Sequence, residues 1–226
     1  MVWHGIDYDP PSVAQAYPTS MSDHNEKTPT NPAIASAAIR IRLRREAIDA
    51  RLAMPAAQRA DHEARIQALL WAWFAAQPVG SVGFCWPIRA EVDCRPVVSR
   101  LLAAGWQAAM PVVVERDAPM RFRAWTPEVA MGQDPYGIPV PLSAEVPVPT
   151  VLLLPLVAFD TAGYRLGYGG GYFDRTLADC TVRPLTLGIG YAMSRVDSIH
   201  PAVHDIPLHA VVTESGVQEF SARFPS

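Results

Sequence analysis

The sequence predicts an α/β fold in a single domain, with a mostly parallel sheet flanked by helices and a strand, a glycine-rich loop and a helix at its centre. Short apolar segments alternate along the chain with segments of helical periodicity, which is typical of parallel strands joined by crossover helices. The central element is the apolar run 151–155, which a short connector joins to the glycine-rich stretch 165–175.

Length and composition indicate one cytoplasmic domain. Half of the 226 residues are hydrophobic, which is enough for a buried core, and the net charge of −3 gives no electrostatic basis for binding nucleic acid. Cys85, Cys94 and Cys180 are odd in number and far apart, so they predict a reducing environment without a disulfide framework. The apolar runs are too short to cross a bilayer, and no secretory signal is visible. We therefore expect a cytoplasmic monomer that binds neither membranes nor nucleic acid.

The first 32 residues predict a disordered tail. Prolines interrupt a polar sequence without apolar periodicity, and such a segment buries too little surface to offset the entropy lost on ordering. The α/β domain is then expected over residues 33–226.

A first helix is predicted over residues 33–53. Its apolar residues recur at helical spacing, at Ile34, Ala38, Ile41, Ile48 and Leu52. Three arginines share one side of this helix, at Arg40, Arg44 and Arg51. Taken alone, the pattern favours a solvated charged face with Glu46 and Asp49 as partners.

A second helix is predicted to begin at Pro55, since proline is favoured in the first turn. Its apolar side carries Ile66, Leu69, Leu70, Trp73 and Phe74. A buried strand follows over residues 81–87, and Asp93 is a candidate N-cap for a helix that runs to Ala104 and ends at Gly105.

The second half of the chain predicts further strands at 106–114, 120–125, 185–190 and 210–213. The proline-rich segment 126–150 between them has a turn signal at Tyr136–Pro139. It is either a surface connector or a loop that lines the ligand site.

The glycine-rich stretch contains Gly167 and the three consecutive glycines Gly169–Gly171, bracketed by Arg165 and Arg175. A strand, a glycine loop and a helix start present backbone N–H groups to an anion, and glycine adopts positive φ without strain. The stretch matches neither a Walker sequence nor a dinucleotide fingerprint, so these residues alone leave a phosphate site and a plain turn equally open.

Glu91 follows the predicted strand 81–87, as the glycine loop follows the strand 151–155. Ligands of parallel sheets bind beyond the carboxyl ends of strands, so the two segments are expected to share one site. The alternative is that Glu91 interacts with the dipole of the following helix.

From Ile34 to Gly216 the chain resembles the 5-formyltetrahydrofolate cyclo-ligases, also called methenyltetrahydrofolate synthetases. The motifs that carry the resemblance are Pro155–Asp160 leading into Arg165–Arg175, Ala90–Asp93, Tyr136–Pro141, and His204–Leu208 with Val212 and Thr213. Arg40 stands where the family commonly has lysine, and a planar guanidinium is not equivalent to an ammonium group.

The resemblance implies an ATP- and Mg²⁺-dependent enzyme that converts 5-formyltetrahydrofolate, with or without a polyglutamate tail, to 5,10-methenyltetrahydrofolate. The implied route is phosphorylation of the formyl oxygen followed by attack of N10. A paralogue that activates another substrate with ATP, or a nucleotide-binding regulator without catalysis, remain alternatives.

The family pattern also assigns roles to residues of this chain. It implies contact with ATP by Arg40, Arg44, Arg165, Leu166, Gly167, Tyr168, Gly169, Gly170, Gly171, Tyr172 and Phe173. It implies contact with the folate by Arg44, Trp86, Glu91, Tyr168, Gly169, Gly170, Gly171 and Tyr172. Arg165, Glu91 and Tyr172 are the implied catalytic residues, and Asp174 and Asp205 are the implied Mg²⁺ ligands.

Overall fold

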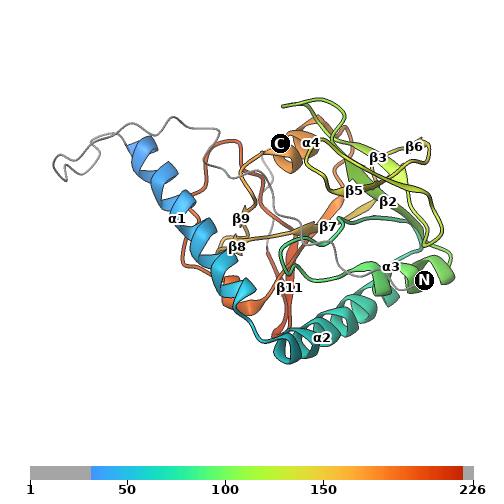
Figure 1. Ribbon diagram of the computed structural model, residues 1–226, viewed down its shortest axis with the longest axis horizontal. Coiled ribbons are helices and arrows are strands. Elements are labelled where there is room, and N and C mark those ends of the chain that lie inside the picture. Colours follow the sequence, from blue (N-terminus) through green and yellow to red (C-terminus); the bar gives the residue numbers. More distant parts are fainter. Residues whose placement is uncertain (1–31, 221–226) are drawn as a thin grey trace.

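The computed structural model describes residues 32–220 as an α/β domain (Figure 1). Its helices are α1 (Pro32–Leu52), α2 (Ala56–Ala75), α3 (Arg95–Ala103) and α4 (Tyr172–Asp179), with a 3₁₀ turn at Ala192–Ser194. Its strands are β1 (Ser81–Gly83), β2 (Gln107–Val112), β3 (Arg121–Ala124), β4 (Met131–Gln133), β5 (Pro139–Pro141), β6 (Glu145–Val146), β7 (Val151–Pro155), β8 (Ala158–Phe159), β9 (Arg165–Leu166), β10 (Leu185–Ile189), β11 (Ala210–Thr213) and β12 (Gly216–Glu219). The predicted tail lies outside the described residues, except for Pro32.

The main sheet has eight strands in the order β12-β11-β10-β7-β1-β2-β3-β6. The five strands from β11 to β2 are parallel, whereas β3, β6 and β12 pair antiparallel at the two edges. This arrangement confirms the mostly parallel sheet. Strand β2 lies on one side of β1 in the sheet, and β7 lies on the other side. The strand order therefore reverses between β1 and β7. Open α/β sheets bind ligands at such a point.

Helices cover both faces of this sheet. Successive strand residues point to opposite faces, so Leu153 packs with α2 and α3, whereas Leu152 and Leu154 pack with Leu177 of α4. Helix α1 lies apart from these layers, against the small β8–β9 hairpin, where Leu43 meets Leu166 (Figure 1). In the part of the chain that the structure describes, no helix combines the length and apolar character needed to cross a bilayer.

Several predicted boundaries are corrected. Pro55 is the N-cap of α2 rather than its first residue, and only Ser81–Gly83 of the predicted strand 81–87 joins the sheet. The N-cap of α3 is Cys94 and not Asp93, although Oδ1 of Asp93 accepts the Arg95 amide at 2.9 Å. The predicted closure by Gly105 is confirmed, since this glycine has φ +91°.

The proline-rich segment 126–150 contains structure that its composition did not reveal. Strands β4 and β5 form a hairpin whose turn places Gly137 at φ +78°. The Oδ1 atom of Asp134 accepts the amides of Tyr136 and Ile138, at 2.8 and 2.9 Å. The hairpin brings Tyr136 to the glycine-rich loop, so the segment is not merely a surface connector.

Candidate functional site

The glycine-rich loop joins β9 to α4 and turns sharply because of its glycines. Gly169 has φ +101°, and Gly171, the N-cap of α4, has φ +66°. Both values lie in the region that residues with a Cβ rarely adopt, which explains why glycine is needed at these two positions. Arg165 lies on β9 directly before the loop, in the bracketing position predicted for it, and is buried.

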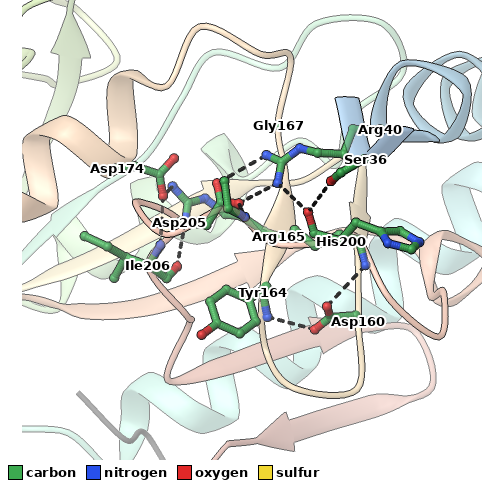
Figure 2. A network of polar contacts seen from close by, with 12 residues as sticks. Ser36, Arg40, Asp160, Tyr164, Arg165, Gly167, Asp174, His200, Asp205 and Ile206 are labelled. Carbon is green, nitrogen blue, oxygen red and sulfur yellow. Dashed lines mark hydrogen bonds and ion pairs between the residues drawn. The ribbon is translucent and has the colours of Figure 1, made fainter. Parts of the chain in front are cut away.

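A buried aspartate holds the hairpin that carries this loop (Figure 2). Oδ1 of Asp160 accepts the Tyr164 amide at 3.0 Å, and Oδ2 accepts the Ile199 amide at 3.2 Å. Asp160 therefore ties the β8–β9 turn to the segment that leads to His200 and Asp205, which fixes two parts of the site relative to each other.

Arg40, Arg44 and Arg51 of α1 face the protein rather than solvent, so the interpretation of this side as a solvated face is wrong. Arg40 forms a bidentate ion pair with Asp205 and donates to the His200 carbonyl at 3.2 Å (Figure 2). Arg44 donates from Nε to the Gly167 carbonyl at 2.8 Å. The exposed side of the helix instead carries Ile41, which is 63% exposed.

Arg165 bridges two segments near the start of α4. Its guanidinium contacts Oδ1 of Asp174 at 3.1 Å and the Ile206 carbonyl at 3.1 Å. The Ile206 amide donates to the same Asp174 oxygen at 3.1 Å, which closes the connection. Arg165 and Arg40 are thus placed near the two implied metal ligands, Asp174 and Asp205 (Figure 2).

Each of the two implied Mg²⁺ ligands is paired with an arginine, Asp205 with Arg40 and Asp174 with Arg165. No group of three or more metal-ligating side chains occurs among the described residues. Mg²⁺ commonly uses only one or two carboxylates and takes its other ligands from phosphate and water. Burial raises the pKa of Asp205, but hydrogen bonds from Arg40 and the Ala202 amide outweigh it, so the net pKa is lowered and the carboxylate stays ionised.

Glu91 meets the glycine-rich loop through a tyrosine. Its Oε1 accepts the Tyr168 hydroxyl at 2.8 Å, and its Oε2 accepts the Ile88 amide at 3.0 Å. This contact shows that the two segments meet, which the shared site predicted for them requires. The alternative role at the start of α3 is not what the structure shows, because Asp93 accepts the Arg95 amide there.

Burial raises the pKa of Glu91, while Arg51, the Ile88 amide and Tyr168 lower it in part. Burial and the nearby Glu91 charge also raise the pKa of Tyr168 well above its usual value. The Tyr168 phenol therefore remains a hydrogen-bond donor to the Glu91 carboxylate at neutral pH.

Tyr172 lines a pocket beside the loop. Its hydroxyl lies 2.6 Å from that of Tyr136, and the two rings meet edge to face with centroids 6.1 Å apart. Together with Pro135 and Val113–Arg116 they line a pocket of about 320 Å³. Trp86 lies apart from these tyrosines, packed against the core, with the Arg95 guanidinium 4.3 Å above its ring centre.

Two residues of this site were missing from the predicted set. Arg51 donates from NH2 to the Tyr168 hydroxyl at 2.7 Å, and its spacing of eleven from Arg40 was the available signal. Tyr136 was noticed only as part of a turn, and nothing in its local sequence indicates its contact with Tyr172.

Comparisons with known proteins identify the family of this chain. Residues 36–214 match the model of the 5-formyltetrahydrofolate cyclo-ligase family. The chain is 36% identical over 138 residues to the 5-formyltetrahydrofolate cyclo-ligase of Escherichia coli, covering 58% of this chain and 75% of the relative. It is 34% identical over 97 residues to the enzyme of the same name from Haemophilus influenzae, covering 40% and 52%.

Solved structures give the same result. The NMR structure of Aquifex aeolicus 5,10-methenyltetrahydrofolate synthetase superposes with a TM-score of 0.67 at 25% identity, covering 83% of this chain and 96% of the other. A 5,10-methenyltetrahydrofolate synthetase from Mycoplasma pneumoniae, at 22% identity and a TM-score of 0.65, shares the fold. The protein therefore belongs to the 5-formyltetrahydrofolate cyclo-ligase family of enzymes.

Proposed function

We propose that this protein converts 5-formyltetrahydrofolate to 5,10-methenyltetrahydrofolate in an ATP- and Mg²⁺-dependent reaction. The observation that carries the proposal is the position of the glycine-rich loop. On one side of the loop lie the arginines that contact its backbone or flank it in the sequence. On the other side, the hydroxyl of Tyr168 in the loop donates to Glu91. One loop thus connects a cationic region to a buried carboxylate.

The cationic region is suited to phosphate groups. Arg44 lies across the loop, with its guanidinium carbon 3.5 Å from the position that a Cβ on Gly169 would occupy. Gly167 has open space around it, which leaves room for a ligand close to the backbone. In this proposal Arg40, Arg44 and Arg165 neutralise phosphate charge, and residues 166–173 line the nucleotide.

The reaction needs activation of a poor leaving group. ATP would supply a phosphoryl group to the formyl oxygen. N10 would then attack the formyl carbon and lose the N10 proton, and the former formyl oxygen would leave as part of the phosphate. The products are 5,10-methenyltetrahydrofolate, ADP and phosphate. Such chemistry asks the protein chiefly for positioning and charge neutralisation, which the arginines and the two aspartates are placed to provide.

The folate side of the proposal rests on Glu91 and the tyrosines. A buried carboxylate selects a ligand with N–H donors, as a pteridine has, and we assign Glu91 the orientation of that ring. Tyr172 and Tyr136 line an adjacent pocket whose volume is within the range of small-molecule sites. The assignment of Trp86 to the folate is retained as part of the proposal.

A spectroscopic assay tests the proposed function. The protein is mixed with 5-formyltetrahydrofolate, ATP and Mg²⁺, and the methenyl chromophore is followed with time. Formation that needs all three components supports the proposal. ATP binding without formation of the chromophore would favour a paralogue with another substrate or a nucleotide-binding regulator. These two are separated by screening other formamides and carboxylates, because a paralogue would hydrolyse ATP with one of them and a regulator would not.

A further inference from the structure

We propose that Arg51 is a positioning residue of this enzyme, which fixes the Glu91 carboxylate through Tyr168 and so aligns the folate with the nucleotide side of the site. This inference rests on the proposed function. Arg51 lies at the last turn of α1 and is only 2% exposed, although arginine is seldom fully buried.

The guanidinium of Arg51 joins three segments that are far apart in the sequence. Nε donates to the Arg89 carbonyl at 2.9 Å, in the loop that carries Glu91. NH1 donates to the Leu156 carbonyl at 3.3 Å, just beyond β7. NH2 donates to the Tyr168 hydroxyl at 2.7 Å, in the glycine-rich loop. The Arg51 side chain thus connects the loop that follows β1 with the segments that follow β7 and β9, at the point between β1 and β7 where the strand order reverses.

These contacts direct the Tyr168 hydroxyl proton. Because Arg51 donates to the phenolic oxygen, the proton on that oxygen is free to point at Oε1 of Glu91, 2.8 Å away. The Ile88 amide donates to the other carboxylate oxygen at 3.0 Å. Both oxygens of Glu91 therefore have fixed donors, which restricts the rotation of its carboxylate.

Arg51 also supports a strained turn. Arg89 and Ala90 have φ +48° and +56°, values that side chains with a Cβ rarely adopt. The hydrogen bond from Nε to the Arg89 carbonyl holds this turn immediately before Glu91. A lysine has one ammonium group in place of the planar fork and is unable to make the three contacts in the same geometry.

The charge of Arg51 favours the ionised form of Glu91. The titratable groups that face this carboxylate are Arg51 of α1, Tyr168 of the loop, Arg89 of its own turn, and Cys85 and Cys94 on either side of that turn. Burial raises the pKa of Glu91, and Arg51 is the largest influence that lowers it. Loss of Arg51 therefore shifts the titration of Glu91 to higher pH.

The test compares Arg51→Met, Arg51→Lys and Tyr168→Phe with wild type. Arg42→Met is the control, because Arg42 lies on the same helix, is exposed and, among residues 32–220, forms an ion pair with Glu46 alone, at 3.7 Å. For Arg51→Met we expect kcat/KM for 5-formyltetrahydrofolate to fall about ten- to hundredfold, as for the loss of a charge-assisted hydrogen bond. The Kd for ATP should change less than about threefold, since Arg51 is not among the assigned phosphate contacts. The acidic limb of the pH profile should move to higher pH.

Arg51→Lys should keep most of the pH profile, because the charge remains, but lose much of kcat/KM. Tyr168→Phe should move the acidic limb in the same direction as Arg51→Met. The proposal would be overturned if the acidic limb of the pH profile stayed at its wild-type position in both Arg51→Met and Tyr168→Phe. Equal losses of ATP affinity and of kcat/KM in Arg51→Met would also overturn it.

A measurement without turnover separates this inference from the proposed function. The Glu91 carboxyl carbon is titrated by NMR in ¹³C-glutamate-labelled protein and assigned with Glu91→Gln. A higher midpoint in Arg51→Met than in wild type supports the inference even if no methenyl product forms, and an unchanged midpoint contradicts it. If circular dichroism shows that Arg51→Met is unfolded, the same comparison is made with Tyr168→Phe, which retains the ring.

Discussion

At the scale of single residues, Glu91 is a buried carboxylate whose hydrogen-bond donors suit a binding site better than a hydrophobic core. Its burial disfavours the charged form, and the donors that offset this cost come from its own turn and from the distant residues Arg51 and Tyr168. A carboxylate held in this way has a fixed direction and a strong preference for an additional donor. A fixed direction and a free acceptor position are what a carboxylate needs to orient an N–H group of a pteridine ring.

Replacing Glu91 by glutamine should therefore reduce turnover and spare nucleotide binding. Glutamine keeps the shape and accepts from Tyr168, but it loses the charge, so we expect kcat to fall about ten- to hundredfold. The Kd for ATP should remain at the wild-type value in calorimetric titration. Glu63→Gln is a matched control, because Glu63 also accepts a tyrosine hydroxyl, that of Tyr191 at 3.0 Å, and is assigned no role in the reaction. Loss of ATP binding in Glu91→Gln would refute its placement on the folate side.

Arg165 is the residue that we propose for the corresponding role on the nucleotide side. Arg165→Ala should weaken ATP binding by tens of fold, since a charge-assisted hydrogen bond contributes about 1.5–3 kcal/mol. Calorimetry measures the Kd for ATP, and Arg65→Ala serves as the control because Arg65 is exposed and its ion pair within the described structure is with Asp61, at 3.0 Å. An unchanged Kd in a folded Arg165→Ala protein would rule out the assigned phosphate contact.

At the scale of elements, the glycine-rich loop holds its shape through backbone conformation. Gly169 has φ +101°, whereas Gly167 lies outside the positive-φ region and has open space around it. The two glycines therefore have different reasons to be present. Gly169 is needed for the path of the chain, whereas neither backbone conformation nor crowding requires glycine at Gly167.

This difference gives a matched pair of substitutions. Gly169→Ala should lower the free energy of unfolding by about 1–3 kcal/mol, the usual cost of a side chain in a disfavoured backbone region. Gly167→Ala should leave it unchanged or raise it by about 0.4–1 kcal/mol, since alanine restricts the unfolded chain. Urea denaturation followed by circular dichroism measures both. Equal destabilisation in the two variants would show that the loop is not held by the conformation of Gly169.

The elements that the sequence predicted well are those with strong local signals. The run Val151–Pro155 was predicted with its exact bounds because it is a continuous apolar strand in the centre of the sheet. The strand predicted at 81–87 was too long, because its apolar residues continue beyond Gly83 as extended chain without a ladder. Short strands such as β8 and β9 were missed, since two residues carry no detectable period.

The site was only partly predictable, because its contacts join distant segments. The spacing of Arg40, Arg44 and Arg51 showed that they share a helix side, but a solvated face and a buried site give the same spacing. Most of their acceptors, among them Asp205 and the Gly167 carbonyl, are more than a hundred residues away. The resemblance to a family indicated phosphate contacts, whereas the network from Arg51 to Glu91 required coordinates.

At the scale of the whole molecule, α1 is attached differently from the other long helix. Helix α2 buries Ile66, Leu70 and Phe74 against the sheet, whereas Arg51 is the only described residue of α1 that is fully buried. The first helix is held mainly by hydrogen bonds and ion pairs from its arginines to the glycine-rich loop, the segment 200–205 and the Arg89 and Leu156 carbonyls. It lies beside the β8–β9 hairpin (Figure 1). Regions with few buried apolar contacts open at low free energy, so α1 should open before the sheet does.

Hydrogen exchange tests this order of opening and its coupling to the ligand. Without ligand, the amides of α1 should exchange faster than those of α2, because their opening does not expose the main core. MgATP should slow exchange in α1 specifically, since the assigned phosphate contacts of Arg40 and Arg44 exist only when the helix is docked. At a hundred times its Kd the nucleotide stabilises the docked state by up to about 2.7 kcal/mol, which corresponds to about a hundredfold slower exchange. Exchange in α2 should change less, and it serves as the internal reference in the same experiment. Equal protection of the two helices without ligand would contradict the proposed attachment, and slowing by MgATP in α2 but not in α1 would contradict the contacts assigned to Arg40 and Arg44.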